Sequence, residues 1–197
     1  MANFDDQESV RRNRQQTHYA MLSELTRLAR EVPASFQQRL PYSTLSAIAS
    51  SLLDGTVFEI VKHLYEIQQM TERKLMEQRA QLVNTHKVMK QEQQRKHRSE
   101  LENCQSKPHN IPLVKHTNDK EKEALDKRIE YEINQMDERI LLELDQRCTE
   151  QQTTLEKAGV HGFYCTSNPQ EVKLQMYVLK FILKLSSMDF GSANAVT

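Results

Sequence analysis

Glycine and proline are almost absent from the middle of this chain. The 197 residues include four glycines and five prolines, and between Thr56 and Ala158 there is no glycine and there are only two prolines, Pro108 and Pro112. A chain that turns often needs these residues, so this stretch does not fit a compact domain of short elements. It predicts two long helices folded back on each other.

Other shortages exclude whole classes of protein. Three cysteines, Cys104, Cys148 and Cys165, are too few and too far apart for a disulfide framework. Basic and acidic residues number 27 each, so no net charge favours binding to nucleic acid or to an anionic membrane. No apolar run approaches the ~20 residues of a membrane span, and the polar N-terminus shows no secretory leader. We therefore expect an intracellular protein without a membrane span.

Motifs for catalysis or cofactor binding are missing as well. Four scattered glycines cannot form a phosphate-binding loop, and neither a nucleophile elbow nor a zinc-protease helix motif occurs. Cys104, His109 and His116 surround the central break, but they lack the four-ligand spacing of structural zinc sites. The sequence thus predicts no catalytic residue, no cofactor and no metal, and an enzyme is the least favoured class.

What is present predicts an all-α protein. Breakers and caps favour a long antiparallel coiled-coil-like helical hairpin with a small helical head formed by the N- and C-terminal helices. The expected parts are N-terminal helices of the head (1–56), a first long helix (57–105), a loop (106–118), a second long helix (119–158), a turn with the C-terminal helix of the head (159–188) and a flexible tail (189–197). The expected N-terminal caps are Asp5 or Asp6, Ser43, Thr56 with Glu59, Asn118 with Glu121, and Asn168 before Pro169.

The second long helix has an 11-residue hydrophobic period. Leu125, Ile129 and Ile133 are followed 11 residues later by Met136, Ile140 and Leu144. This period is typical of a straight or slightly right-handed helical pair. The first long helix is apolar at its start, but its stripe nearly vanishes beyond Met89.

This asymmetry suggests a binding surface, because exposed apolar stripes favour association. We expect self-association or capture of a partner helix along residues 125–144. The expected contact residues are Leu125, Ile129, Ile133, Met136 and Ile140.

Charge and aromatic residues indicate how the parts assemble. If the two helices pair around a loop near residue 112, residue n of the first lies beside roughly residue 224 − n of the second. This places the basic segment 87–98 against the acidic residues of 126–137. Of the twelve aromatic residues, only Tyr131 lies between Glu66 and Gly162. The hydrophobic core is therefore expected where the two terminal regions meet.

Two basic clusters leave an alternative open. Residues 11–14 contain three arginines, and residues 94–98 contain two arginines and a lysine. Such clusters could serve a nuclear protein that contacts nucleic acid, but neither has interleaved aromatic residues. Nucleic acid is therefore the less expected partner.

Several segments resemble a known family. The segments 33–40, 52–61, 107–112, 154–159 and 162–171 are similar to the family of the DiGeorge syndrome critical region protein and the insect gonadal protein, and the resemblance covers roughly residues 15–185. The tail after Lys184 favours the insect branch. The resemblance implies a coiled-coil protein associated with development, in gonad or neural crest, and nuclear rather than cytoplasmic. It brings no catalytic or cofactor residues.

These observations predict a non-catalytic coiled-coil interaction or adaptor protein. Its partners are expected to be proteins bound through helix–helix contacts. A nuclear nucleic-acid-associated protein that uses the basic clusters is the alternative.

Overall fold

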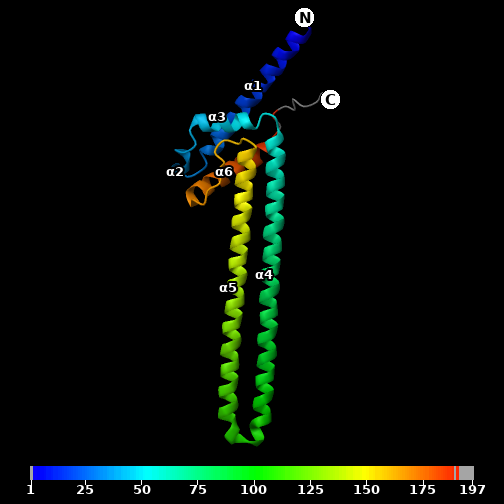
Figure 1. Cartoon of the computed structure of the whole chain (residues 1–197), viewed down its shortest axis with the longest axis vertical. Helices are drawn as coiled ribbons and strands as arrows, with labels where there is room; N and C mark the ends of the chain where they lie inside the picture. Colours follow the sequence, from blue (N-terminus) through cyan, green and yellow to red (C-terminus); the bar gives the residue numbers. More distant parts are fainter. Residues whose placement is uncertain (1, 189, 191–197) are drawn as a thin grey trace. The chain divides into compact units, whose positions relative to one another are not determined.

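A computed structural model of the chain describes the backbone of residues 2–188 and 190, and the side chains of residues 7–188 and 190. Over this part the chain is all-α and contains no strand (Figure 1). Its elements are α1 (Ala2–Ala29), α2 (Ala34–Gln37), α3 (Tyr42–Ser51), α4 (Thr56–Asn103), the 3₁₀ turns η1 (Cys104–Ser106) and η2 (Pro108–Asn110), α5 (Ile111–Lys157) and α6 (Pro169–Ser186). The predicted all-α helical hairpin is confirmed.

The chain divides into two compact units. The terminal unit comprises Met1–Gln68 and Arg147–Thr197, and the hairpin unit comprises Gln69–Gln146. Both ends of the sequence thus contribute to one unit, as the distribution of aromatic residues predicts.

The terminal unit contains the main hydrophobic core. Within it, α1 contacts both α3 and α6. The largest fully buried side chains are Leu25, Leu28, Ile48, Leu52, Val61, Leu155, Ile182 and Leu185. Each such burial stabilises by about 1.5–3 kcal/mol relative to exposure, so this core is the main source of stability in the unit.

Two buried amides hold the segment between α5 and α6. Gln152 donates to the Thr166 carbonyl oxygen (3.1 Å) and to Gln175 Oε1 (2.9 Å), and it accepts from the Thr166 amide (3.1 Å). Gln175 donates to the carbonyl oxygens of Tyr164 (3.1 Å) and Gly162 (3.3 Å). The irregular segment thereby gains partners for its backbone groups in the interior of the unit.

In the hairpin unit, α4 and α5 run antiparallel side by side (Figure 1). The burial pattern of α5 follows the predicted 11-residue period, with steps of four, four and three residues. The predicted positions Leu125, Ile129, Ile133, Met136, Ile140 and Leu144 are all buried or half-buried, and so are Glu121, Glu132 and Glu143. The inward face of α5 is thus partly apolar and partly charged.

The connection between the long helices is shorter than the sequence predicts. The two 3₁₀ turns occupy residues 104–110 and α5 begins at Ile111, so the expected loop over 106–118 and helix start at 119 are wrong. Pro112 is the second residue of α5, where a backbone N–H would have no intrahelical partner, and proline is therefore tolerated there. The tighter turn changes the register of the two helices. The residue numbers of ion-paired residues on α4 and α5 add to 216–218 and not to roughly 224.

Most of the expected caps differ in the structure. The helix α1 begins ahead of Asp5 and Asp6, and α3 begins after Pro41 without a side-chain cap. At the start of α4, Asp54 Oδ1 accepts from the Thr56 amide at 3.0 Å, so the aspartate caps this helix.

Two further cap predictions have opposite outcomes. Asn118 lies inside α5, where no cap is needed. The cap at Asn168 is confirmed, since its Oδ1 accepts from the Gln170 amide at 2.9 Å and Pro169 follows as the first helical residue. Apart from Phe190, the expected tail over 189–197 lies outside the described residues.

Candidate interaction surfaces

The five predicted contact residues on α5 lie along one face, and that face is turned toward α4. Ile129 is buried, with 7% of its surface exposed. Leu125, Ile133, Met136 and Ile140 are half-buried. The structure thus brings the stripe together inside the helical pair but leaves part of it open, and its contact with a partner stays a prediction.

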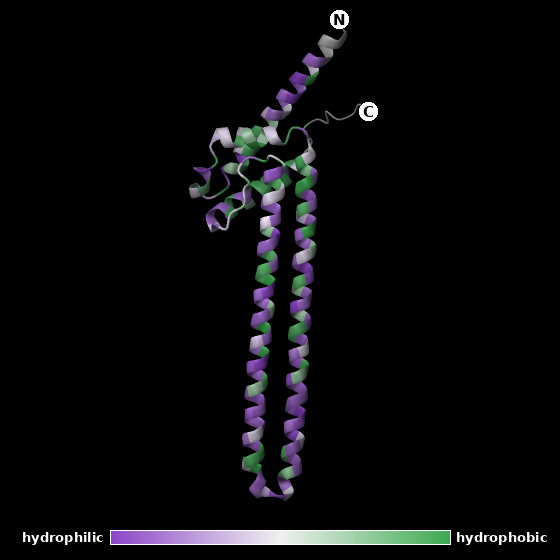
Figure 2. Cartoon of the chain, in the orientation of Figure 1, coloured by the Kyte–Doolittle hydropathy of each residue, from purple (hydrophilic) through white to green (hydrophobic). Residues whose placement is uncertain are grey.

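The facing surface of α4 is poor in apolar residues, as expected. Leu75 is buried and Leu82 and Met89 are half-buried, but His86 occupies the central position with 3% of its surface exposed. Its Nε2 lies 2.7 Å from Glu132 Oε2, and among the described residues its Nδ1 has no partner. Hydrophilic residues predominate along this unit (Figure 2).

Ion pairs join the two helices along their length. Arg79 binds Asp137 through two hydrogen bonds of 2.7 and 3.1 Å, which hold the pKa of that carboxyl below its usual range. Lys90 lies 2.7 Å from Asp126. Each exposed pair contributes only about 0.2–1 kcal/mol, so the pairs specify which residues face each other more than they stabilise the fold.

The basic cluster at residues 94–98 takes part in this pairing. Lys96 Nζ and His97 Nε2 both lie 3.0 Å from Glu121 Oε2. The hydrogen bonds from His97, and then from Lys96, lower the pKa of Glu121. Part of the cluster is therefore engaged within the hairpin, whereas Arg95 and Arg98 are exposed.

Several large apolar side chains of the hairpin unit are exposed outside the seam, the surface along which α4 and α5 face each other. Met76 on α4 is 63% exposed and Leu141 on α5 is 62% exposed, and Val83 is exposed as well. The sequence reasoning missed them because the 11-residue period follows only the residues between the helices. Their angular positions around the helix axes, away from the residues of the seam, could have identified them.

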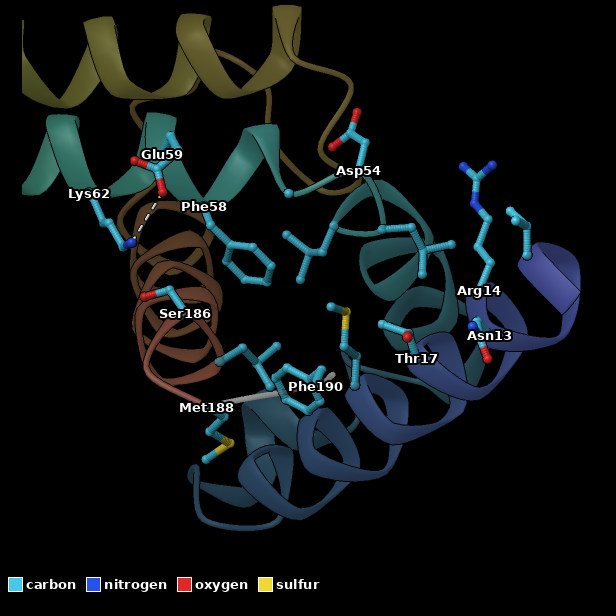
Figure 3. A pocket seen from close by; sticks show the side chains of 16 residues that line it. Asn13, Arg14, Thr17, Asp54, Phe58, Glu59, Lys62, Ser186, Met188 and Phe190 are labelled. Carbon is cyan, nitrogen blue, oxygen red and sulfur yellow. Dashed lines mark hydrogen bonds and ion pairs between the residues drawn. The ribbon is translucent and has the colours of Figure 1, made fainter. Parts of the chain in front are cut away.

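A groove of about 730 Å³ crosses the terminal unit (Figure 3). Its apolar lining includes Met21, Phe58 and Leu185. Charged residues at the groove include Arg14 and Lys62, and Lys62 donates to Glu59 at 3.2 Å. The lining comes from α1, the α3–α4 turn, α4 and the end of α6, so no local sequence pattern could have indicated it.

Cys104, His109 and His116 do not come together in the structure, and within its described residues no three His, Cys, Asp or Glu side chains form a group that could hold a metal. In the same part of the chain no single helix is long and apolar enough to cross a membrane. Only α3 and α4 taken together, across a bend of 91°, meet these requirements.

The structure therefore defines an all-α protein that contains a long antiparallel helical hairpin. The chain belongs to the family of the DiGeorge syndrome critical region 6 (DGCR6) protein, whose family model matches residues 2–193. This confirms the family resemblance seen in the sequence.

Two relatives cover most of the chain. Protein DGCR6 of Gallus gallus is 50% identical over 181 residues, which are 92% of this chain and 90% of the chicken protein. The gonadal protein gdl of Drosophila melanogaster is 35% identical over 174 residues, which are 87% of this chain and 81% of the fly protein. Identity to the chicken relative is the higher of the two, so the leaning toward the insect branch is not supported. The names associate the family with development, and no solved structure matches the chain.

Proposed function

We propose that this protein is a non-catalytic adaptor that binds other proteins through helix–helix contacts of its hairpin unit. The observation that supports this most directly is the mismatch between the two helices. The α5 stripe faces a row of α4 that contains His86 at its centre, and Leu125, Ile133 and Met136 remain half-exposed. A partner helix that lies along residues 125–144 would cover the apolar surface that α4 leaves open.

Two other considerations support an adaptor. The sequence offers no motif for catalysis, cofactor binding or metal binding, so the surfaces are the features on which a function can rest. The names of the relatives favour a developmental context that includes the gonad, and the family resemblance adds the neural crest. Location in the nucleus is proposed from the family resemblance alone.

The test is to replace Ile129, Ile133 and Met136 by glutamine and to compare partner capture from cell extract with melting temperature. Because Ile129 is buried, its change is expected to lower stability as well. A second variant therefore changes only the half-buried Ile133 and Met136. A control variant carries glutamine at the exposed positions Ala124, Tyr131 and Glu138.

An adaptor loses its partner proteins in both stripe variants and keeps them in the control. Circular dichroism checks that the less disruptive variant remains helical. If that variant binds the same partners as the wild type and only melts earlier, the stripe serves the hairpin alone and the proposal fails.

A nucleic-acid-associated protein is the second candidate, and one observation favours it. Arg11 and Arg14 of α1 line the same shallow groove as the exposed Tyr19 and Tyr42. Aromatic side chains beside arginines can stack on bases while the cations contact phosphates. Binding to RNA or DNA that weakens steeply with added salt would favour this candidate over the adaptor.

A further inference from the structure

One face of the hairpin unit carries opposite charges on its two helices. Residues spaced three or four apart share one face of a helix. On α4 the row contains Met76, Val83, Lys87, Lys90 and Arg98, and on α5 it contains Asp119, Glu123, Asp126, Glu130 and Leu141. We call this surface the charged face.

Ion pairs within the chain fix the position of these rows. Lys90 pairs with Asp126, so the two rows border the same side of the hairpin. Since partner numbers add to about 217, Lys87 lies level with Glu130 and Arg98 lies level with Asp119.

The charges at these levels are available to a partner. Lys87, Arg98, Asp119 and Glu130 are all exposed, and none of them has an ion pair within the described part of the chain. An adjacent apolar area is contributed by Met76 and Leu141, which lie level with each other, and by Val83.

We infer that the charged face binds a second copy of this chain, with a two-fold axis parallel to the helices. The inference rests on the proposed function, and it names the partner for one surface of the adaptor. This rotation lays α4 of each copy on α5 of the other at the same level. Lys87 then faces the Glu130 of the second copy, and Arg98 faces its Asp119.

The geometry of the two rows selects this orientation. A two-fold axis perpendicular to the helices would lay α4 on α4 and α5 on α5, so that basic residues would face basic residues and acidic ones acidic ones. The parallel axis brings Lys87, Lys90 and Arg98 opposite acidic residues of the other copy, and it brings Met76 of one copy against Leu141 of the other. Four helices packed in this way bury Met76, Val83 and Leu141 at one end of the contact, and the charges determine the arrangement.

Charge reversal tests the inference. One variant carries Lys87→Glu and Arg98→Glu, and a second carries Asp119→Lys and Glu130→Lys. Each alone places like charges opposite each other at four points of the symmetric contact. Self-association measured by sedimentation velocity is expected to weaken at least tenfold, about 1.4 kcal/mol, in either variant.

Mixing provides the decisive comparison. In an equimolar mixture of the two variants every contact again joins opposite charges, so a mixed dimer should form with the affinity of the wild type. A single chain with all four reversals should also regain self-association. The control is Lys74→Glu with Arg139→Glu, which reverses two exposed charges away from the charged face and should leave dimerisation unchanged.

Several results would overturn the inference. These are a wild type that stays monomeric at all concentrations, single-row variants that dimerise like the wild type, or a mixture that does not restore the dimer. A monomeric wild type that still captures partner proteins through the stripe on α5 would leave the proposed function intact. A dimer restored by mixing, together with no partner capture, would support this inference while the adaptor proposal fails.

Discussion

Replacing Gln152 by leucine tests how the terminal unit holds the segment between α5 and α6. Only 3% of Gln152 and 4% of Gln175 is exposed. The change removes three hydrogen bonds that Gln152 makes, two with the backbone of Thr166 and one with Gln175. Leucine is close to glutamine in size, so the effect reflects the lost polar partners more than a cavity.

The expected cost follows from the groups left behind. The Oε1 atom of Gln175 loses its donor in the interior, and a buried unsatisfied group costs about 1–3 kcal/mol. The amide and carbonyl of Thr166 lose their partners too, but Thr166 is half-buried and water can replace part of the loss. A total of about 2–4 kcal/mol follows, which lowers the melting temperature by about 5–15 °C for a chain of this size.

Hydrogen exchange gives the sharper measurement, because it localises the effect. The amide of Thr166 should exchange at least tenfold faster in the variant, while amides of the hairpin unit keep their rates. Gln170→Leu, at an exposed position of α6, is the matched control and should change neither quantity. A Gln152→Leu protein that melts within 2 °C of the wild type, with unchanged exchange at Thr166, would refute the role assigned to these amides.

Two further predictions concern the hairpin unit. Hydrogen bonds from Arg128, and then from His86, lower the pKa of Glu132, and His97 lowers that of Glu121. This stabilisation is therefore present above the unfolded carboxyl pKa of about 4.3 and is lost as pH falls through the lower folded values. Melting curves at pH 5, 4 and 3 should show a drop that shrinks when both glutamates are glutamine, and an equal drop in that variant would contradict the assignment. The His86→Leu variant should melt at or above the wild-type temperature, because Glu132 keeps its ion pair with Arg128. The Glu132→Leu variant leaves the buried imidazole of His86 without its partner and should lower the free energy of unfolding by about 1–3 kcal/mol. A Glu132→Leu protein that melts at a higher temperature than the His86→Leu protein would be inconsistent with this account.

The sequence predicts the long helices well for a simple physical reason. Without glycine or proline, nothing between Thr56 and Asn103 interrupts the helical backbone. The 11-residue period on α5 likewise identifies its inward face, because burial follows the helical repeat. Both features are local and need no knowledge of the tertiary structure.

The loop and the caps are predicted less well because their signals are ambiguous. A proline indicates a break, but it is equally compatible with the first turn of a helix, which is where Pro112 lies. An asparagine followed three residues later by a glutamate resembles a cap, yet Asn118 and Glu121 lie inside α5. Whether such a residue marks a helix boundary or lies within a helix depends on where the chain turns, and packing determines that position.

Because the loop was predicted at the wrong residues, the charged face could not be identified from the sequence. Which residues of α4 and α5 lie level with each other depends on the register, and a turn centred near residue 112 displaces every pair by about seven residues. Lys87 and Glu130 then no longer lie level. The groove of the terminal unit was out of reach for a similar reason, because its lining comes from segments far apart in the sequence.

The charges of the seam account for why the observed register is the one adopted. Leu75, Leu82 and Met89 recur on α4 every seven residues, so a slip by seven would leave these side chains on the same side of the helix. Apolar packing alone therefore discriminates poorly between the observed register, in which the numbers of facing residues add to about 217, and the slipped register, in which they add to about 224.

The pairing of Lys96 distinguishes the two registers. In the slipped register Lys96 would lie level with Arg128, whereas in the structure it lies 3.0 Å from Glu121. Like charges at one level destabilise the slipped pairing, and opposite charges stabilise the observed one. The polar residues between the helices thus reduce apolar burial but favour the observed register, and that register places Lys87 level with Glu130 and Arg98 level with Asp119. The charges that align the two helices therefore determine which residues lie level with each other on the charged face.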